Sequence, residues 1–215
     1  MQNKVLDTSF QHADNPLMSQ RRSSLPALDT EAQEQLRYIR TSIERAGAFT
    51  AVPGWGGTIM GATALAAAWI ASRAETTQGW LAVWLVEAVV AFLIGCWAIR
   101  IKALRFRTPI FGGSARRFAM TMSPPLVAGA IITASVVQNN QVGALPGIWL
   151  LLYGSAVVAG GASSVRVVPL LGLALMAVGA AALFSPTSWG NAYLAIGFGM
   201  LQIAFGIYIA RRHGG

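Results

Sequence analysis

One carboxylic acid lies inside an otherwise apolar stretch of this 215-residue chain. The stretch is residues 79–99, GWLAVWLVEAVVAFLIGCWAI, and the acid is Glu87. At 1.5 Å per residue, a helix of this length covers roughly 30 Å, the thickness of a bilayer's hydrocarbon core. A carboxylate at that depth is costly unless it is protonated, hydrogen-bonded or open to a water-filled cavity. Glu87 is therefore the first residue to consider for chemistry.

Three further polar side chains are expected near the depth of Glu87. Counted from the residues that mark the outer ends of their helices, Glu87 lies about 10 Å deep and Gln202 about 13 Å deep. Ser155 and Thr63 fall at a similar depth. These positions predict a polar layer in the outer third of the membrane, formed by Glu87, Gln202, Ser155 and Thr63.

Two interpretations of this layer are open. In the first, Glu87 forms a proton- or cation-coupled site. In the second, Glu87 is neutral and fixes helix packing through a hydrogen bond. We expect the second, with Glu87 protonated and bonded to Gln202 or Ser155, because no cation is firmly within reach. Arg73, at the outer end of its helix, is the one guanidinium that could approach Glu87 and offer an ionic alternative.

The inventory of reactive residues argues against an enzyme. Both histidines, His12 and His213, lie outside the apolar stretches. This excludes haem ligation by histidine and a Ser-His catalytic dyad within the bilayer. The single cysteine, Cys96, excludes a CxxC pair. No glycine-rich phosphate loop follows a strand pattern. We therefore predict no catalytic, cofactor-binding or metal-binding residue, and no cofactor.

The composition is that of a membrane protein. Hydrophobic residues make up 54% of the chain and charged residues only 11%, compared with roughly 25% charged in an average soluble domain. The formal net charge of +8 could suggest nucleic acid. The basic residues cluster beside apolar stretches, however, where anionic lipid headgroups explain them better. We predict a lipid bilayer as the partner and no nucleic acid.

The apolar stretches predict an all-α, polytopic membrane bundle of six transmembrane helices preceded by an amphipathic helix. Loops rich in Gly, Pro and polar residues separate the stretches, as expected for helices that turn back at each face of a bilayer. The predicted spans are residues 52–72, 79–99, 118–137, 144–162, 167–184 and 190–210.

The residues before the spans divide into a tail and a helix. Residues 1–28 lack periodicity and read as a disordered cytoplasmic tail. Residues 29–50 place Leu36, Ile39 and Ile43 on one face, which predicts an amphipathic juxtamembrane helix before the transmembrane domain, 51–215. This helix could lie in the headgroup region, pack on the protein's own cytoplasmic surface or dock on a partner, and we expect the first.

The distribution of Lys and Arg predicts the orientation. Three occur in the twenty residues before the first span, then one, six, none, one and none in the loops, and two in the tail. This alternation predicts that both termini lie in the cytoplasm. The predicted contacts with lipid headgroups are Arg37, Arg40, Arg45, Arg100, Lys102, Arg105, Arg107, Arg116 and Arg117.

Small residues in the first span favour close helix packing. Gly57 and Gly61 have GxxxG spacing, which lets a neighbouring backbone approach. We expect this packing within the monomer, and association into a homo-oligomer or a larger membrane complex is the alternative. A weak internal repeat also aligns WLAV at residue 80 with YLAI at residue 193.

Two segments carry a resemblance. At LRYIRTSIERAGAFTAVPGWGG, residues 36–57, and at SSVRVVPLLG, residues 163–172, the chain resembles an uncharacterised group of small six-span bacterial membrane proteins. The resemblance covers residues 30–215 and implies a bacterial inner membrane, with no activity to transfer. We predict a non-enzymatic accessory, sensory or regulatory component, and the alternative is a small proton- or cation-coupled transporter with Glu87 in its site.

Overall fold

The computed structural model describes residues 33–39, 54–105, 113–162 and 164–213, and all secondary structure in these ranges is helical. The chain divides into two units, residues 1–48 and 49–215. In the first unit the described helix covers residues 33–39 and exposes Leu36 and Ile39. The rest of the predicted amphipathic helix and the predicted tail lie outside the described residues, so those two predictions stay untested.

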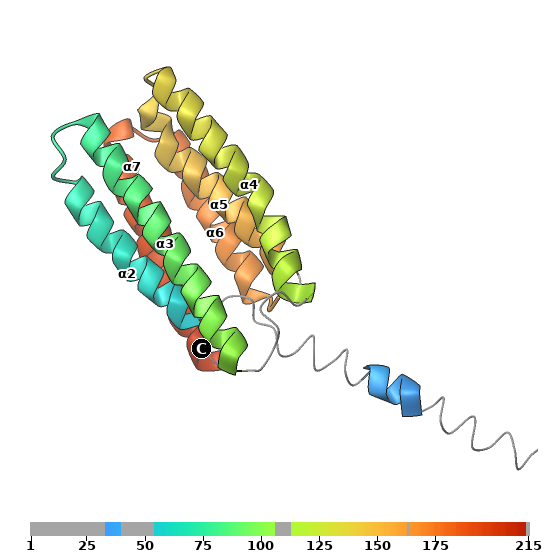
Figure 1. Ribbon diagram of the computed structural model, residues 1–215. Helices are drawn as coiled ribbons and strands as arrows, with labels where there is room; N and C mark the ends of the chain where they lie inside the picture. The colour runs from blue at the N-terminus through green and yellow to red at the C-terminus, as the bar shows by residue number, and fades with distance from the viewer. Residues whose placement is uncertain (1–32, 40–53, 106–112, 163, 214–215) are drawn as a thin grey trace, which may run out of the picture. The chain divides into compact units, whose positions relative to one another are not determined.

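The second unit is a helical bundle with a helix in each of the six predicted stretches (Figure 1). The last of these helices, named the C-terminal helix here, consists of three consecutive parts: α7, a π-helical segment (η3) and α8. The helices are α2 Gly54–Ala71, α3 Thr77–Arg105, α4 Gly113–Gln138, α5 Leu145–Gly161, α6 Val167–Leu183, α7 Gly190–Leu194, η3 Ala195–Leu201 and α8 Gln202–His213.

Four of the described helical segments are long and apolar enough to cross a membrane: Thr77–Ile101, Phe118–Gln138, Val142–Gly161 and Thr187–Arg212. A shorter apolar helix covers Val167–Leu183. These segments confirm the predicted class, an all-α protein with several helices able to span a membrane, but not the predicted number of six spans. α2 is not among these segments; it is built largely from Gly and Ala, which are less apolar than the Leu, Val and Ile of the others.

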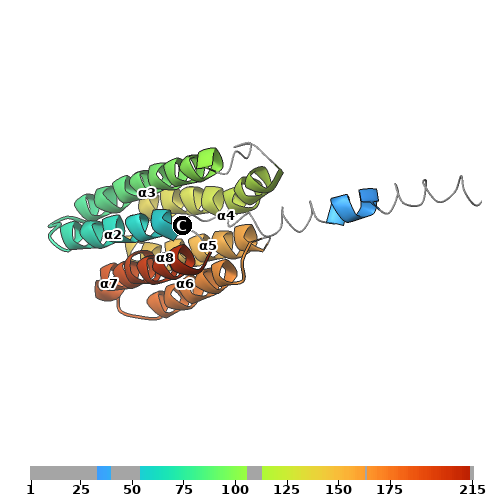
Figure 2. The same ribbon diagram turned by 90° about the horizontal axis from the view of Figure 1, so that it is seen from below.

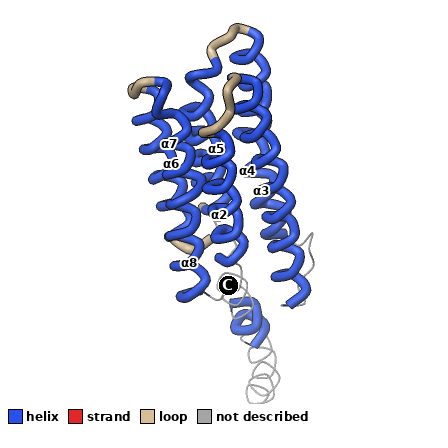
Figure 3. The backbone as a smooth tube through the Cα atoms, turned by 90° about the vertical axis from the view of Figure 1, so that its left-hand side faces the viewer, coloured by secondary structure: helices blue, strands red, loops and turns tan. Residues whose placement is uncertain are grey.

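Short connections force neighbouring helices to run in opposite directions. Figure 1 shows the starts of α2, α4 and α6 at the end of the bundle where the C-terminus lies. The loops after α2, α4 and α6 lie at the other end, as the tube in Figure 3 shows. This up-and-down path is the one expected when each helix crosses the same layer.

Glycines allow two antiparallel helix pairs to approach closely. Each of the four helices has glycines spaced seven residues, or two turns, apart, so these lie on one face of their helix. They are Gly54 and Gly61 in α2, Gly147, Gly154 and Gly161 in α5, Gly172 and Gly179 in α6, and Gly199 and Gly206 in the C-terminal helix. A methyl group on Gly61 of α2 would lie 2.7 Å from the carbonyl oxygen of Gly199, and one on Gly154 of α5 would lie 2.7 Å from that of Gly172. The two pairs are therefore α2 with the C-terminal helix and α5 with α6. Contact between their backbones leaves no room for side chains.

The remaining two helices pack on the outside of these pairs. α3 lies against α2, and α4 lies against α5. Figure 2 shows α3 and α4 on one side of the bundle, with α6 and the C-terminal helix on the other. Only 17% of the apolar segment of α3 and 6% of that of α4 is buried. Both helices therefore present most of their apolar surface to the surroundings, as lipid-facing helices do.

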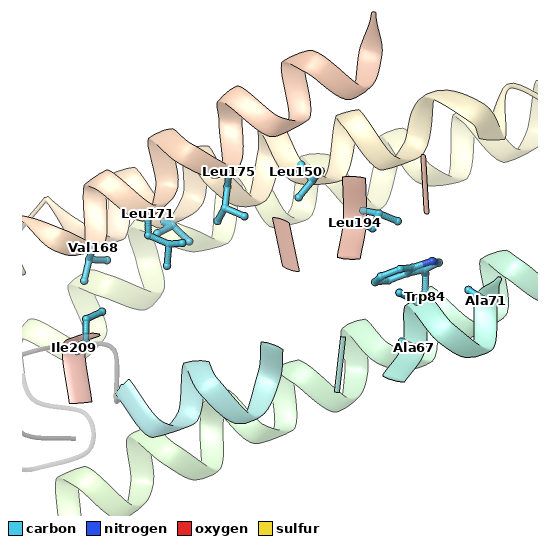
Figure 4. Packing of buried hydrophobic residues seen from close by; sticks show 11 residues of the cluster. Ala67, Ala71, Trp84, Leu150, Val168, Leu171, Leu175, Leu194 and Ile209 are labelled. Carbon is cyan, nitrogen blue, oxygen red and sulfur yellow. The ribbon is translucent and has the colours of Figure 1, made fainter. Parts of the chain in front are cut away.

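The core lies between the two glycine-lined pairs (Figure 4). Leu150 of α5 and Leu171 and Leu175 of α6 point toward Leu194 and Ile209 of the C-terminal helix. Each of these five side chains is at most 3% exposed. This apolar seam joins the two pairs into one bundle.

We expect Gly61→Ala to lower the free energy of unfolding by about 1–3 kcal/mol, because the added methyl group would overlap backbone atoms of the C-terminal helix. Gly57→Ala in the same helix is the matched control. Its methyl group would lie 3.7 Å from the nearest atom, an ordinary contact, so it should leave stability unchanged or slightly higher. Reversible unfolding in mixed micelles measures both. Equal losses in the two variants would contradict the close approach.

Candidate functional site

One stripe of α3 carries the polar and aromatic side chains that face the bundle. Trp80, Trp84 and Glu87 are spaced by four and three residues, which places them on the same face of a helix. Trp84 is 3% exposed and Glu87 is 8% exposed. The opposite face of α3 exposes large apolar residues such as Phe92 and Leu93. The stripe therefore anchors α3 while the rest of the helix stays outside.

Glu87 contacts a hydroxyl of the neighbouring helix α2. Thr63 Oγ1 lies 2.8 Å from Glu87 Oε1, a distance typical of a hydrogen bond. The same Thr63 oxygen lies 2.9 Å from the carbonyl oxygen of Met60, one turn earlier in α2. Threonine in a helix often bonds back to such a carbonyl. One hydroxyl group is therefore within hydrogen-bond distance of both the Glu87 carboxyl group and the Met60 carbonyl oxygen.

The number of hydrogens indicates which form of Glu87 fits this geometry. A threonine hydroxyl has one hydrogen to donate, and a carbonyl oxygen can only accept. If Glu87 is ionised, it also can only accept, so Thr63 satisfies either Glu87 or Met60. If Glu87 is protonated, it donates to Thr63, and Thr63 donates to Met60. The neutral carboxylic acid is the form that makes both contacts at once.

Asn191, in the first turn of α7, connects three helices. Its Oδ1 accepts hydrogen bonds from Trp84 Nε1 at 3.1 Å and from Trp80 Nε1 at 3.3 Å. Its Nδ2 donates to the carbonyl oxygen of Ala68 in α2 at 2.9 Å. The amide thus holds α3 and α2 against the C-terminal helix, and every polar group in this contact has a partner.

Aromatic rings fill the space beside Asn191. Trp80 of α3 and Trp149 of α5 stack with ring centroids 5.9 Å apart and planes 3° from parallel. Phe198 contacts Trp84 at 6.4 Å and meets Tyr153 edge-on at 5.3 Å. These rings pack in arrangements that aromatic pairs favour. They occupy the interior between α3, α5 and the C-terminal helix.

Because of the π-helical segment, the side chains of Asn191 and Gln202 face different neighbouring helices. Asn191 and Gln202 are eleven residues apart, so a regular α-helix would place them within about 20° of each other. The π-helical bonds of Ala195–Leu201 turn the chain less per residue. As a result Asn191 meets α2 and α3, whereas Gln202 Nε2 donates to Tyr153 OH of α5 at 2.9 Å.

The structure brings together only part of the predicted polar layer. Glu87 pairs with Thr63, whereas the prediction named Gln202 or Ser155 as its partner. Gln202 is 5% exposed and pairs with Tyr153. Ser155 donates to the carbonyl oxygen of Leu152 in its own helix at 2.8 Å, as short polar side chains in helices commonly do.

Arg73 is engaged away from Glu87. Its guanidinium lies 3.5 Å from the centroid of the Trp69 ring and donates to the Trp69 carbonyl oxygen at 3.1 Å. Arg73 is exposed. The ionic alternative for Glu87 therefore has no support from this geometry.

The predicted headgroup contacts in the second unit lie at helix ends. Arg100 and Arg116 are exposed, and Lys102, Arg105 and Arg117 lie in the same terminal turns of α3 and α4. Arg37 is exposed in the first unit. Arg40, Arg45 and Arg107 fall outside the described residues.

Sequence reasoning missed Asn191, Trp84 and Tyr153. The rings of Trp80 of α3 and Trp149 of α5, each partly buried, stack on one another. The sequence did contain a signal for this contact. An amide in an apolar helix needs hydrogen-bond partners, and Trp80 and Trp84 are four residues apart, so both can face the same amide. The sequence did not say which helix would supply it.

Comparisons with models of protein families, with curated proteins and with solved structures found no match. The resemblance of residues 36–57 and 163–172 to small six-span bacterial membrane proteins therefore stays a prediction. The arrangement itself consists of separate buried polar contacts, centred on Glu87, Asn191 and Gln202, that each join neighbouring helices.

We expect Glu87→Gln to keep the stability of the wild type, because a neutral amide can donate to Thr63 as a protonated carboxyl would. Glu87→Ala should lose about 1–3 kcal/mol, since the polar atoms around Thr63 then lose a partner. Unfolding in mixed micelles measures the difference. Infrared spectroscopy at neutral pH should show a protonated carboxyl band that is missing in Glu87→Gln.

Thr63→Val is the matched variant for this prediction. It removes the hydroxyl with little change of shape, so the carboxyl band should persist and shift to the frequency of a more weakly bonded acid. A wild-type protein without the band, combined with a Glu87→Gln variant as unstable as Glu87→Ala, would mean that Glu87 is ionised.

Proposed function

We propose that this chain is a six-span integral protein of a bacterial inner membrane that acts as a non-enzymatic accessory, sensory or regulatory component. The observation that carries the proposal is the mutual pairing of the buried polar groups. Glu87 meets Thr63, Gln202 meets Tyr153, and Asn191 meets two tryptophans. Aromatic rings and glycine contacts fill the space between the helices around them.

A transporter needs a solvated path to a site near the middle of the membrane. Glu87 is buried against α2 and is not among the residues that line the apolar groove between α3 and α4. The groove opens on the outside of the bundle, away from the stripe that carries Glu87. This separation favours an accessory role over proton- or cation-coupled transport, which is the second candidate.

The orientation follows from charge. We place the end of the bundle that contains the C-terminus in the cytoplasm, because basic residues gather there and the opposite end has Arg73 balanced by Glu75. Each Lys or Arg near an anionic surface contributes about 1 kcal/mol to membrane attraction. The described basic residues at this end are Arg100, Lys102, Arg105, Arg116, Arg117, Arg166, Arg211 and Arg212.

The topology can be tested with reporters. A fluorescent protein fused after His213 should fluoresce, and alkaline phosphatase at the same position should be inactive, because both reporters would be cytoplasmic. Inserted at Asn140, in the loop after α4, the two reporters should give the opposite result. An active phosphatase after His213 would reverse the proposed orientation.

The role can be tested with proteoliposomes that contain a pH-sensitive dye. We expect the wild type and Glu87→Gln to show the same proton leak as empty liposomes under an applied gradient. Proton flux in the wild type that Glu87→Gln abolishes would establish the transporter instead. Chemical cross-linking in native membranes, followed by affinity purification, should then recover the membrane complex that an accessory component serves.

A further inference from the structure

A groove runs between the outer halves of α3 and α4. The two helices pack on α2 and α5 and leave a space between them of about 490 Å³. Leu81 and Leu85 of α3 form one wall, and Ala130, Ala134 and Val137 of α4 form the other. The groove therefore opens sideways from the bundle, toward the membrane interior of the proposed arrangement.

The lining demands an apolar occupant. Apart from Gln138 at its end, the one polar side chain in the wall is Thr133. Its hydroxyl accepts a hydrogen bond from Trp149 Nε1 at 2.8 Å and donates to the carbonyl oxygen of Gly129 at 2.7 Å. Its hydrogen is therefore used within the protein, and the wall offers an occupant mainly methyl and methylene groups.

The length of the groove matches one acyl chain. The lining of α4 runs from Ala130 to Gln138, eight residue steps or about 12 Å along the axis. The hydrocarbon core of a bilayer is roughly 30 Å thick, so an acyl chain of one leaflet covers about 15 Å of it. A transmembrane helix crosses the whole core and would contact the groove along less than half of its length.

One end of the groove is polar. Gln138 closes it, and Asn139, Asn140 and Gln141 follow, all exposed. These amides lie at the outer end of the bundle, the level at which lipid headgroups occur in the proposed orientation. Amide N–H groups can donate to phosphate and ester oxygens. The other end, at Ala130, lies toward the middle of the membrane.

We propose that the α3–α4 groove is a binding site for a phospholipid of the outer leaflet, with one acyl chain along Leu81, Leu85, Ala130 and Ala134 and the headgroup at the amides 138–141. The order of apolar wall and polar end matches the order of chain and headgroup in such a lipid. The site rests on the proposed spanning arrangement, which sets the depth of each residue.

The experiment uses the full-length protein in native membranes that contain a phosphatidylethanolamine with a photoactivatable diazirine in its acyl chain. After irradiation and purification, mass spectrometry maps the labelled residues. We expect labelling of the groove residues to exceed that of Val127 and Ile131, which are exposed on α4 outside the groove.

Ala134→Phe should abolish this excess, because the ring occupies the groove from an exposed position that the core does not use. Ala177→Phe is the matched control, since Ala177 is exposed on α6 and should leave the labelling unchanged. If Ala134→Phe purifies poorly, the smaller Ala134→Leu gives the same test.

Three results would overturn the site. Equal labelling of groove and non-groove positions would mean bulk lipid only, and persistence of the excess in Ala134→Phe would place the lipid elsewhere. Cross-links from a photoreactive residue at position 134 to another protein would give the groove a protein partner. Labelling of none of the helices would instead defeat the spanning arrangement itself.

Discussion

The structure depends on the close approach of helices at glycine. Lipid tails are as apolar as leucine, so helices in a membrane gain little from hiding apolar side chains from lipid. Dispersion contacts and interhelical hydrogen bonds must hold them together, and both need short distances. Glycines on α2, α5, α6 and the C-terminal helix provide those distances, because a side chain at these positions would overlap the neighbouring backbone.

Close packing at glycine also fixes the register of the polar contacts. Once α2 and the C-terminal helix are in register, Asn191 lies level with the carbonyl oxygen of Ala68 and can accept from Trp80 and Trp84. The π-helical segment then turns Gln202 toward Tyr153. An α-helical version of the segment would leave one of the two amides facing the wrong neighbour.

The bundle consequently has two kinds of surface. Its interior is packed with apolar side chains, and Glu87, Asn191 and Gln202 each hydrogen-bond to a neighbouring helix there. Its outside, on α3 and α4, is apolar and incompletely packed, with a groove between two helices that each rest on a different inner helix. The buried polar contacts and the apolar groove therefore lie on different sides of α3.

The sequence by itself determined the class, the positions of the helices and the one costly carboxyl group. Apolar runs about as long as a bilayer is thick have few alternatives to helix, and a lone acid among them must be protonated or paired. For the same reason all six predicted stretches coincide with helices, with ends that differ by at most six residues. Thr63 also belonged to the predicted layer, because depth follows from counting residues along a helix.

Only the tertiary structure decided which helices are neighbours. Periodicity gives the depth of a residue and its face but not the helix that this face meets, so Glu87 was assigned to Gln202 or Ser155 when its partner is Thr63. The same limit applies to Trp80 of α3 and Trp149 of α5, because only the packing of the helices shows that their rings stack on each other. A π-helical turn adds a rotation that no count at 3.6 residues per turn anticipates, which is why Asn191 and Gln202 meet different helices.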